Sequence, residues 1–235
     1  MQQGNETEKI KMTNFIHKTK TEKLNLFFPF FLFFLYSCAT SVTEFSFQTG
    51  DLLFQVGKNS ELNEAITEVT SGERDIHYTH IGIVLVENDT VFVIEAIPPE
   101  VSKTLLDTFL SRSANLGEKP MLAVGRLKPE YREVIPQALI RAKNLLGKPY
   151  DYVYSPDNDA YYCSELITFS FLNKQNMPIF EPIKMNFRDA DGNLPAYWIE
   201  HFEKQNAEIP ENKLGSNPSE LSKSEKIEII YRYFQ

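Results

Sequence analysis

The pattern of apolar and polar positions divides the chain into short strands and amphipathic helices. Runs rich in β-branched and aromatic residues predict strands, and apolar residues three or four positions apart predict helices. The predicted strands cover residues 52–56, 80–86, 91–96, 121–127 and 226–233, and the predicted helices cover 60–69, 104–110, 130–146, 163–173 and 195–202. The polar segment 203–224 predicts a long surface loop. Together these elements indicate an α+β fold, an antiparallel sheet packed against helices.

The strands at 80–86 and 91–96 are predicted to form a hairpin. Asn88 and Asp89 lie between them and are typical turn residues. With that turn, Glu95 lies opposite Gly82 and diagonal to His80 on the same face of the sheet. Diagonal neighbours are roughly 7–8 Å apart, which long side chains can span. We therefore expect Glu95 to hold the imidazole of His80 in one orientation.

Glu95 has an apolar sequence environment, because Ile94, Ala96 and Ile97 surround it. A buried carboxylate requires a partner, and His80 is the partner that the hairpin offers. Taken singly, a histidine at the start of a strand is usually structural and a glutamate near a strand end is usually solvated.

Cys163 begins the helix predicted over 163–173. A helix N-terminus has unpaired N–H groups and a partial positive charge, and both favour the reactive thiolate. This position suggests a nucleophile. The alternative is a buried cysteine that serves as a small hydrophobic residue.

Composition indicates one globular domain behind a leader. The chain has 235 residues, of which 42% are hydrophobic, so it can bury a full core. The net charge of −8 and the absence of a Lys/Arg block in the sequence argue against nucleic acid as a partner.

The first 38 residues predict a targeting segment. Lysines precede an apolar stretch over 24–36 that is too short for a membrane span of about 20 residues but fits the apolar region of a signal peptide. Its ending, Leu-Tyr-Ser-Cys at 35–38, resembles the bacterial lipoprotein signal, in which Cys38 is lipidated. We expect a signal peptide at 1–38, a tether at 39–49 and the domain at 50–235. A retained anchor and a plain signal peptide are the alternatives.

Metal and cofactor binding are not expected. His77 and His80 form an H-x2-H pair, but the chain has only four histidines and no acidic cluster at ligand spacing nearby. No other motif implies a cofactor.

Five segments together resemble a known family. They are Gly-Asp-Leu-Leu-Phe at 50–54, Thr-His-Ile-Gly-Ile-Val at 79–84, Val-Ile-Glu-Ala at 93–96, Gly-Lys-Pro-Tyr-Asp at 147–151 and Tyr-Cys-Ser-Glu-Leu at 162–166. Residues 50–233 are thus similar to the YiiX-like branch of the permuted NlpC/P60 papain-like hydrolases. In this branch the histidine strand precedes the cysteine helix, whereas ordinary NlpC/P60 domains have the reverse order.

The resemblance implies a circularly permuted papain-like fold and a set of site residues. It implies Cys163 as the nucleophile, His80 as the general base and Glu95 as the group that orients His80. Tyr162 and Tyr150 are expected to wall the substrate pocket. The backbone N–H of Cys163, at the helix start, is a natural oxyanion donor.

The resemblance also implies an activity. It implies a thiol hydrolase that cleaves amide bonds in small peptides or cell-wall fragments through an acyl-enzyme. The leader and Cys38 lead us to expect that this enzyme is exported and anchored by lipid in the bacterial cell envelope. The alternatives are an acyltransferase or lipid deacylase that uses the same thiol, and a non-catalytic binding lipoprotein. A long apolar groove favours a lipid, whereas an acidic, polar pocket favours a peptide or free amine.

Overall fold

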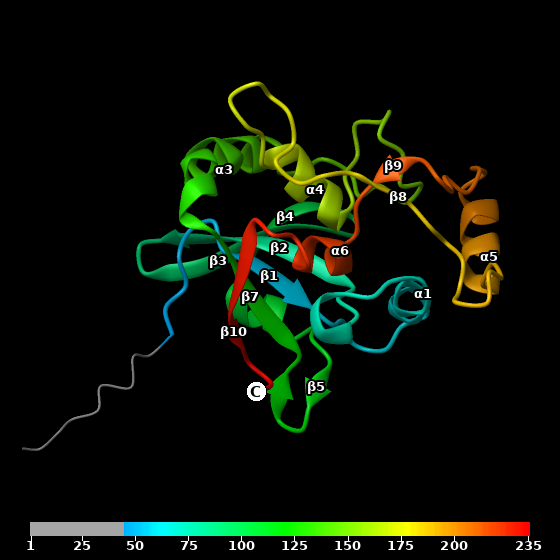
Figure 1. The fold of residues 1–235 in the computed structure, drawn as a ribbon, viewed down its shortest axis with the longest axis horizontal. Coiled ribbons are helices and arrows are strands. Elements are labelled where there is room, and N and C mark those ends of the chain that lie inside the picture. The colour runs from blue at the N-terminus through cyan, green and yellow to red at the C-terminus, as the bar shows by residue number, and fades with distance from the viewer. Residues whose placement is uncertain (1–44) are drawn as a thin grey trace, which may run out of the picture. The chain divides into compact units, whose positions relative to one another are not determined.

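A six-stranded antiparallel sheet forms the centre of the protein in a computed structural model that describes residues 45–235 (Figure 1). Its strand order is β10-β7-β1-β2-β3-β4. These strands are β1 (Leu52–Gln55), β2 (His80–Glu87), β3 (Thr90–Ile97), β4 (Glu100–Leu105), β7 (Leu122–Leu127) and β10 (Ile227–Arg232). Two small sheets pair β5 (Asn115–Leu116) with β6 (Lys119–Pro120), and β8 (Ile183–Lys184) with β9 (Leu214–Gly215).

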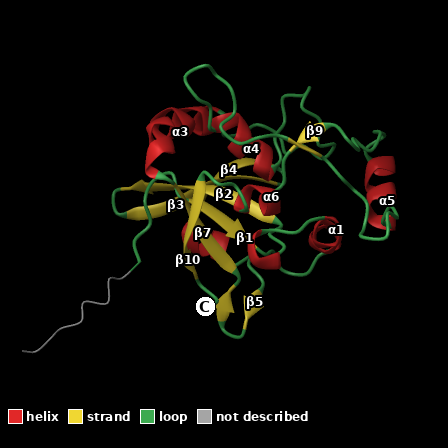
Figure 2. Ribbon diagram, viewed as in Figure 1, coloured by secondary structure: helices red, strands yellow, loops and turns green. Residues whose placement is uncertain are grey.

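The helices lie on both faces and at one end of the sheet (Figure 2). They are α1 (Glu61–Val69), α2 (Leu106–Leu110), α3 (Ile135–Asn144), α4 (Cys163–Ser170), α5 (Ala196–Lys204) and α6 (Pro218–Ser222), with 3₁₀ turns η1 (Glu73–Asp75) and η2 (Pro129–Val134). Helix α4 packs on β2, β3 and α3, whereas α2 packs on β3 and β4. Helices α1 and α5 contact each other away from the sheet. The expected α+β architecture is confirmed.

Strand periodicity builds two cores, one on each face of the sheet. On β1, Leu52 and Phe54 join the larger core, which includes Leu166 of α4, while Leu53 joins the smaller core with Phe109 of α2. Successive side chains of a strand point to opposite faces, so a four-residue strand supplies both cores. Helix α4 therefore rests on the larger core.

The hairpin has the predicted register. Ile83 pairs with Ile94, and the turn consists of Asn88 and Asp89, which have φ values of 48° and 59°. Two such residues form a type I′ turn, whose twist matches that of the flanking strands. Gly82 is required because a Cβ there would lie 2.4 Å from a methyl group of Val93.

Two element boundaries differ from the sequence prediction. Residues 104–105 belong to β4 rather than to the helix predicted over 104–110, because β4 pairs along β3 as far as Leu105. The helix predicted over 163–173 ends at Ser170, since Phe171 leaves the helical conformation. Local spacing does not report either strand pairing or the end of a buried helix.

The surface loop predicted for 203–224 is wrong in its second half. That half contains β9 and the capped helix α6, in which Ser219 and Leu221 are buried. The Ser219 hydroxyl donates to the carbonyl of Tyr78 at 3.0 Å. Small polar residues are buried here because their hydrogen bonds are satisfied inside the protein, which composition does not reveal.

Packing contacts begin at Phe45, before the expected domain start at Gly50. The ring of Phe45 stacks on that of Tyr231 with centroids 4.5 Å apart, and Phe47 packs on the smaller core. The predicted signal peptide and Cys38 lie outside the described residues. Within residues 45–235, no helix has the length and apolarity needed to cross a membrane.

Glu165 in the first turn of α4 is a carboxyl group in an unfavourable environment. Burial, followed by repulsion from Asp151, raises the pKa of Glu165 to about 8. Asp151 is itself buried and accepts hydrogen bonds from the backbone N–H groups of Val153 and Ser155. Glu165 is therefore uncharged in the folded protein at neutral pH.

Replacing Glu165 by glutamine should stabilise the fold increasingly as the pH rises. The folded pKa lies above the usual value of about 4.3, so the wild type loses stability as the pH rises from there to about 8, whereas glutamine does not titrate. Thermal unfolding at pH 5, 6.5 and 8 should show a growing difference in Tm. The exposed Glu118→Gln serves as the control. A Tm difference that is constant across this range would contradict the assignment.

Candidate active site

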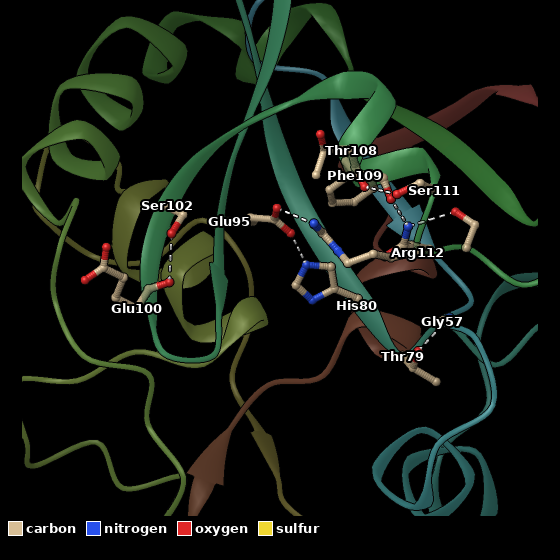
Figure 3. A network of polar contacts seen from close by, with 12 residues as sticks. Gly57, Thr79, His80, Glu95, Glu100, Ser102, Thr108, Phe109, Ser111 and Arg112 are labelled. Atoms are coloured by element: carbon tan, nitrogen blue, oxygen red, sulfur yellow. Dashed lines mark hydrogen bonds and ion pairs between the residues drawn. The ribbon is translucent and has the colours of Figure 1, made fainter.

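His80 and Glu95 form the centre of the candidate active site (Figure 3). His80 is the first residue of β2 and Glu95 lies near the end of β3. The Nε2 atom of His80 is 2.5 Å from Oε2 of Glu95, and the Glu95 side chain is 0% exposed. This contact confirms the juxtaposition expected from the hairpin register. Because Nε2 is held by Glu95, Nδ1 is the ring nitrogen left for another partner.

Arg112 completes the surroundings of Glu95, and sequence reasoning missed it. Its Nη2 donates to Oε1 of Glu95, so each carboxylate oxygen has an ion-pair partner (Figure 3). Arg112 follows α2, and it reaches Glu95 only because α2 packs against β3 and β4. No motif marks this arginine in the sequence.

The segment that carries Arg112 is fixed by buried hydrogen bonds. The side-chain amide of Gln55, on β1, donates to the carbonyl of Phe109 at 2.7 Å and to the hydroxyl of Ser113 at 2.8 Å. The backbone N–H of Lys58 donates to the carbonyl of Arg112 at 3.0 Å. The guanidinium group is therefore positioned by the sheet rather than by a free loop.

Cys163 is the first residue of α4 and is buried. Its helix packs on β2 and β3, and Cys163 and His80 line the same cavity. Cys163 is the free cysteine of the described chain. The structure thus brings together the three residues that the sequence analysis singled out for chemistry.

The electrostatics favour a charged imidazole beside a charged carboxylate. Burial, the largest single influence on His80, lowers its pKa, but hydrogen bonds and charge interactions with Cys163 and Glu95 outweigh burial and raise the pKa to about 9. Burial acts to raise the pKa of Glu95, yet interactions with His80, Thr104 and Arg112 hold it below its ordinary value. At neutral pH the pair is therefore imidazolium and carboxylate.

A cavity of about 250 Å³ opens onto Cys163, His80 and Arg112. Much of its wall is apolar or aromatic and includes Ile66, Ile97, Tyr150, Tyr162, Phe187 and Trp198. Tyr150 and Tyr162 thus line the cavity, as expected. Neither Asp nor Glu is among the residues that line it.

Helix α5 supplies a wall that the sequence analysis did not assign to the site. Its Trp198 is buried and packs edge-on against Phe187, with ring centroids 5.0 Å apart. The apolar spacing of residues 195–202 predicted the helix, but only tertiary packing places it beside the cavity.

Several buried polar atoms at the cavity have no hydrogen-bond partner among the described residues. They are the hydroxyl oxygens of Ser164 and Ser216, the indole Nε1 of Trp198 and the Nε of Arg112. Buried polar groups are normally satisfied, so these atoms are available to water or to a bound molecule. An apolar cavity with a few polar groups is typical of a small-molecule or peptide-residue site.

Three comparisons with known proteins identify relatives of this chain. Residues 46–231 match the family described as "Permuted papain-like amidase enzyme, YaeF/YiiX, C92 family". The chain is 31% identical over 180 residues to the uncharacterized protein YiiX of Escherichia coli (strain K12), covering 74% of this chain and 82% of that protein. A crystal structure titled metalloprotein yiiX from Escherichia coli O157:H7 superposes with a TM-score of 0.66 at 26% identity, covering 80% of this chain and 98% of that chain.

The sheet, the order of the histidine hairpin and the cysteine helix, and these matches lead to one conclusion. The chain belongs to the YaeF/YiiX, C92 family of permuted papain-like amidases.

Proposed function

We propose that this protein is a cysteine hydrolase of amide bonds, with Cys163 as nucleophile, His80 as general base and acid, and Glu95 as the orienting group. The observation that supports this proposal is the position of His80 between a buried carboxylate and the thiol at the start of α4. A thiol, a base and a group that orients the base constitute the arrangement required for nucleophilic catalysis.

The proposed reaction passes through a thioester. The Cys163 thiolate attacks the amide carbonyl carbon, and the imidazolium of His80 gives its proton to the leaving amine as the C–N bond breaks. Neutral His80 then takes a proton from water, which attacks the thioester and releases the acid. The proton on His80 restores the thiolate–imidazolium pair. The backbone N–H of Cys163, in the first turn of α4, donates to the oxyanion.

The cavity indicates which amides suit the site. Arg112 and His80 are its only charged lining residues among those described, and both interact with Glu95. A substrate ammonium group would find no counter-ion there, so the cavity is not the acidic, polar pocket expected for a free amine. The proposed substrates are small peptides or cell-wall-derived peptides that place an uncharged group in the cavity. The apolar wall also favours a second candidate function, acyl transfer or lipid deacylation through the same thioester.

The chemistry is assigned to the thiol rather than to a metal. The solved relative is titled a metalloprotein. In residues 45–235, no group of three or more His, Cys, Asp or Glu side chains is arranged to hold a metal ion. His80 is engaged by Glu95 and Cys163 instead. The donor set of residues 45–235 therefore does not fit a metal centre, and the proposed steps involve only side chains of this protein and water.

Export and lipid anchoring are also proposed. The lysines, the short apolar stretch and Cys38 form the pattern of a lipoprotein signal. A domain anchored in the bacterial cell envelope would meet cell-wall peptides at the membrane surface.

Substitution of the proposed nucleophile should abolish hydrolysis. Cys163→Ala should reduce amide hydrolysis to background, and Glu95→Gln should lower kcat by roughly 10²- to 10⁴-fold because the base loses its orienting charge. Hydrolysis is measured by mass spectrometry on a panel of small peptides and cell-wall fragments. Glu118→Gln is the matched control.

The two substitutions also test the non-catalytic alternative. Wild-type turnover in Cys163→Ala would exclude the thiol mechanism. Iodoacetamide should alkylate Cys163 faster at pH 6 in the wild type than in His80→Ala, since His80 stabilises the thiolate. Equal rates would favour a binding lipoprotein.

Activity should fall above about pH 9. Below that pH His80 is the imidazolium that protonates the leaving amine, and as the pH rises through its pKa of about 9 this proton is lost. The stability contributed by the raised pKa is lost as the pH rises from about 6.5 to about 9, so Trp198 fluorescence should be recorded to separate unfolding from titration. A kcat/KM profile that begins to fall near pH 6.5, the usual histidine value, would contradict the assignment.

Cys38→Ala should release the protein from membranes. The variant should lose incorporated fatty acid and leave the membrane fraction, whereas Cys163→Ala should retain both. Fractionation of cells labelled with a fatty-acid analogue measures this. Equal labelling of Cys38→Ala and the wild type would exclude Cys38 as the lipid site.

A further inference from the structure

Glu95 is a carboxylate that the fold removes completely from solvent. Its side chain is 0% exposed, and its ion-pair partners among the described residues are His80 and Arg112. Removing a carboxylate from water costs several kcal/mol unless charges and hydrogen bonds replace the water. Arg112 supplies a charge that does not depend on pH, because a guanidinium group is always protonated in proteins.

The closeness of His80 and Glu95 raises the question of which residue holds their shared proton. A neutral imidazole beside a carboxylic acid and an imidazolium beside a carboxylate contain the same atoms. A permanent positive charge next to the carboxylate stabilises the second arrangement. Only the second arrangement gives His80 the proton that the leaving amine requires.

We propose that Arg112 is a positioning residue that keeps Glu95 ionised, so that the proton shared by Glu95 and His80 stays on the imidazole. This inference rests on the function proposed above. In this inference Arg112 acts through Glu95 and not on the reacting thiol or the scissile bond.

The position of Arg112 fits this task. Its backbone forms hydrogen bonds with the backbones of Lys58 and Phe109, and the Gln55 side chain donates a hydrogen bond to the carbonyl of Phe109. The guanidinium carbon lies 5.6 Å from the centre of the Phe109 ring, and its side chain is 31% exposed. An arginine held in this way keeps its charge beside Glu95 at little cost in side-chain entropy.

No other permanent cation contacts Glu95 in the described chain. The groups that face Glu95 are His80 from β2, Thr104 from β4 and Arg112 from the segment after α2. Cys163 of α4 lies beyond His80 and acts on it directly. Loss of Arg112 therefore leaves the carboxylate with a hydroxyl and a titrating ring as its partners.

The test compares Arg112→Gln, Arg112→Lys and Lys174→Gln in the full-length protein. Arg112→Gln should lower kcat by roughly 10- to 100-fold, by analogy with the loss of a hydrogen-bond partner behind a metal-ligating side chain, with little change in KM. It should also move the acidic limb of the kcat/KM profile to higher pH, since Glu95 then binds a proton more readily. Arg112→Lys should return the acidic limb to its wild-type pH and restore most of kcat. Lys174 is an exposed cation paired with Glu133, and its substitution should change neither kcat nor the pH of the acidic limb.

A spectroscopic measurement follows the proton without substrate. In ¹⁵N-histidine NMR at pH 7, the His80 ring should be imidazolium in the wild type and in Arg112→Lys, and it should shift toward the neutral ring in Arg112→Gln. The resonance is assigned by its absence from His80→Gln. Circular dichroism establishes that each variant is folded.

Three results would overturn the inference. If Arg112→Gln behaves like Lys174→Gln, the charge of Arg112 has no role in the reaction. A lower rate with an unmoved acidic limb and an unchanged His80 resonance would indicate a purely structural arginine. A higher KM confined to carboxylate-bearing substrates would make Arg112 a substrate-binding residue.

The NMR readout separates this inference from the proposed function. If the wild type hydrolyses no amide while Arg112→Gln still shifts His80, the function fails and the inference stands. If the wild type is active and the His80 resonance is the same in both proteins, the inference alone fails.

Discussion

The ion pair between Glu95 and its two partners is the interaction on which the rest of the site depends. A carboxylate without exposed surface is tolerated in β3 because His80 and Arg112 each satisfy one of its oxygens. Those partners come from different elements, so the sheet register and the packing of α2 must both be correct. Removing one partner of a buried ion pair costs about 3–5 kcal/mol of folding stability. The residues proposed for the chemistry therefore also contribute to the stability of the sheet.

The two faces of the sheet support different parts of the site. The larger core supports α4 and so fixes Cys163 relative to β2, whereas the smaller core supports α2 and so fixes the approach of Arg112 to β3. His80 and Glu95 extend from adjacent strands between these supports. The thiol and the guanidinium are thereby held by different elements at the cavity that also contains His80.

The sequence predicted those parts of the site that depend on local structure. The hairpin register follows from a two-residue turn, so it located Glu95 beside His80, and the helix start at Cys163 follows from apolar spacing. Arg112 was missed because nothing near it in the chain reports that α2 folds beneath β3.

The same limitation explains the errors in the later part of the chain. Helix α6 was assigned to a loop because the buried serines in it look like surface residues until Tyr78 is placed beside them. The resemblance to a family brought Cys163 to the hairpin, a contact that propensity and periodicity alone do not provide.

The order of the elements along the chain has a consequence for biosynthesis. The histidine–glutamate pair belongs to one hairpin, and its arginine follows within the next helix and turn, whereas Cys163 and the edge strand β10 come much later. During translation from the N-terminus, the base and its supports emerge before the thiol does. In the proposed mechanism a partly synthesised chain therefore has a prepared imidazole but no nucleophile. Of the side chains in the proposed mechanism, the nucleophile is therefore the last to be synthesised.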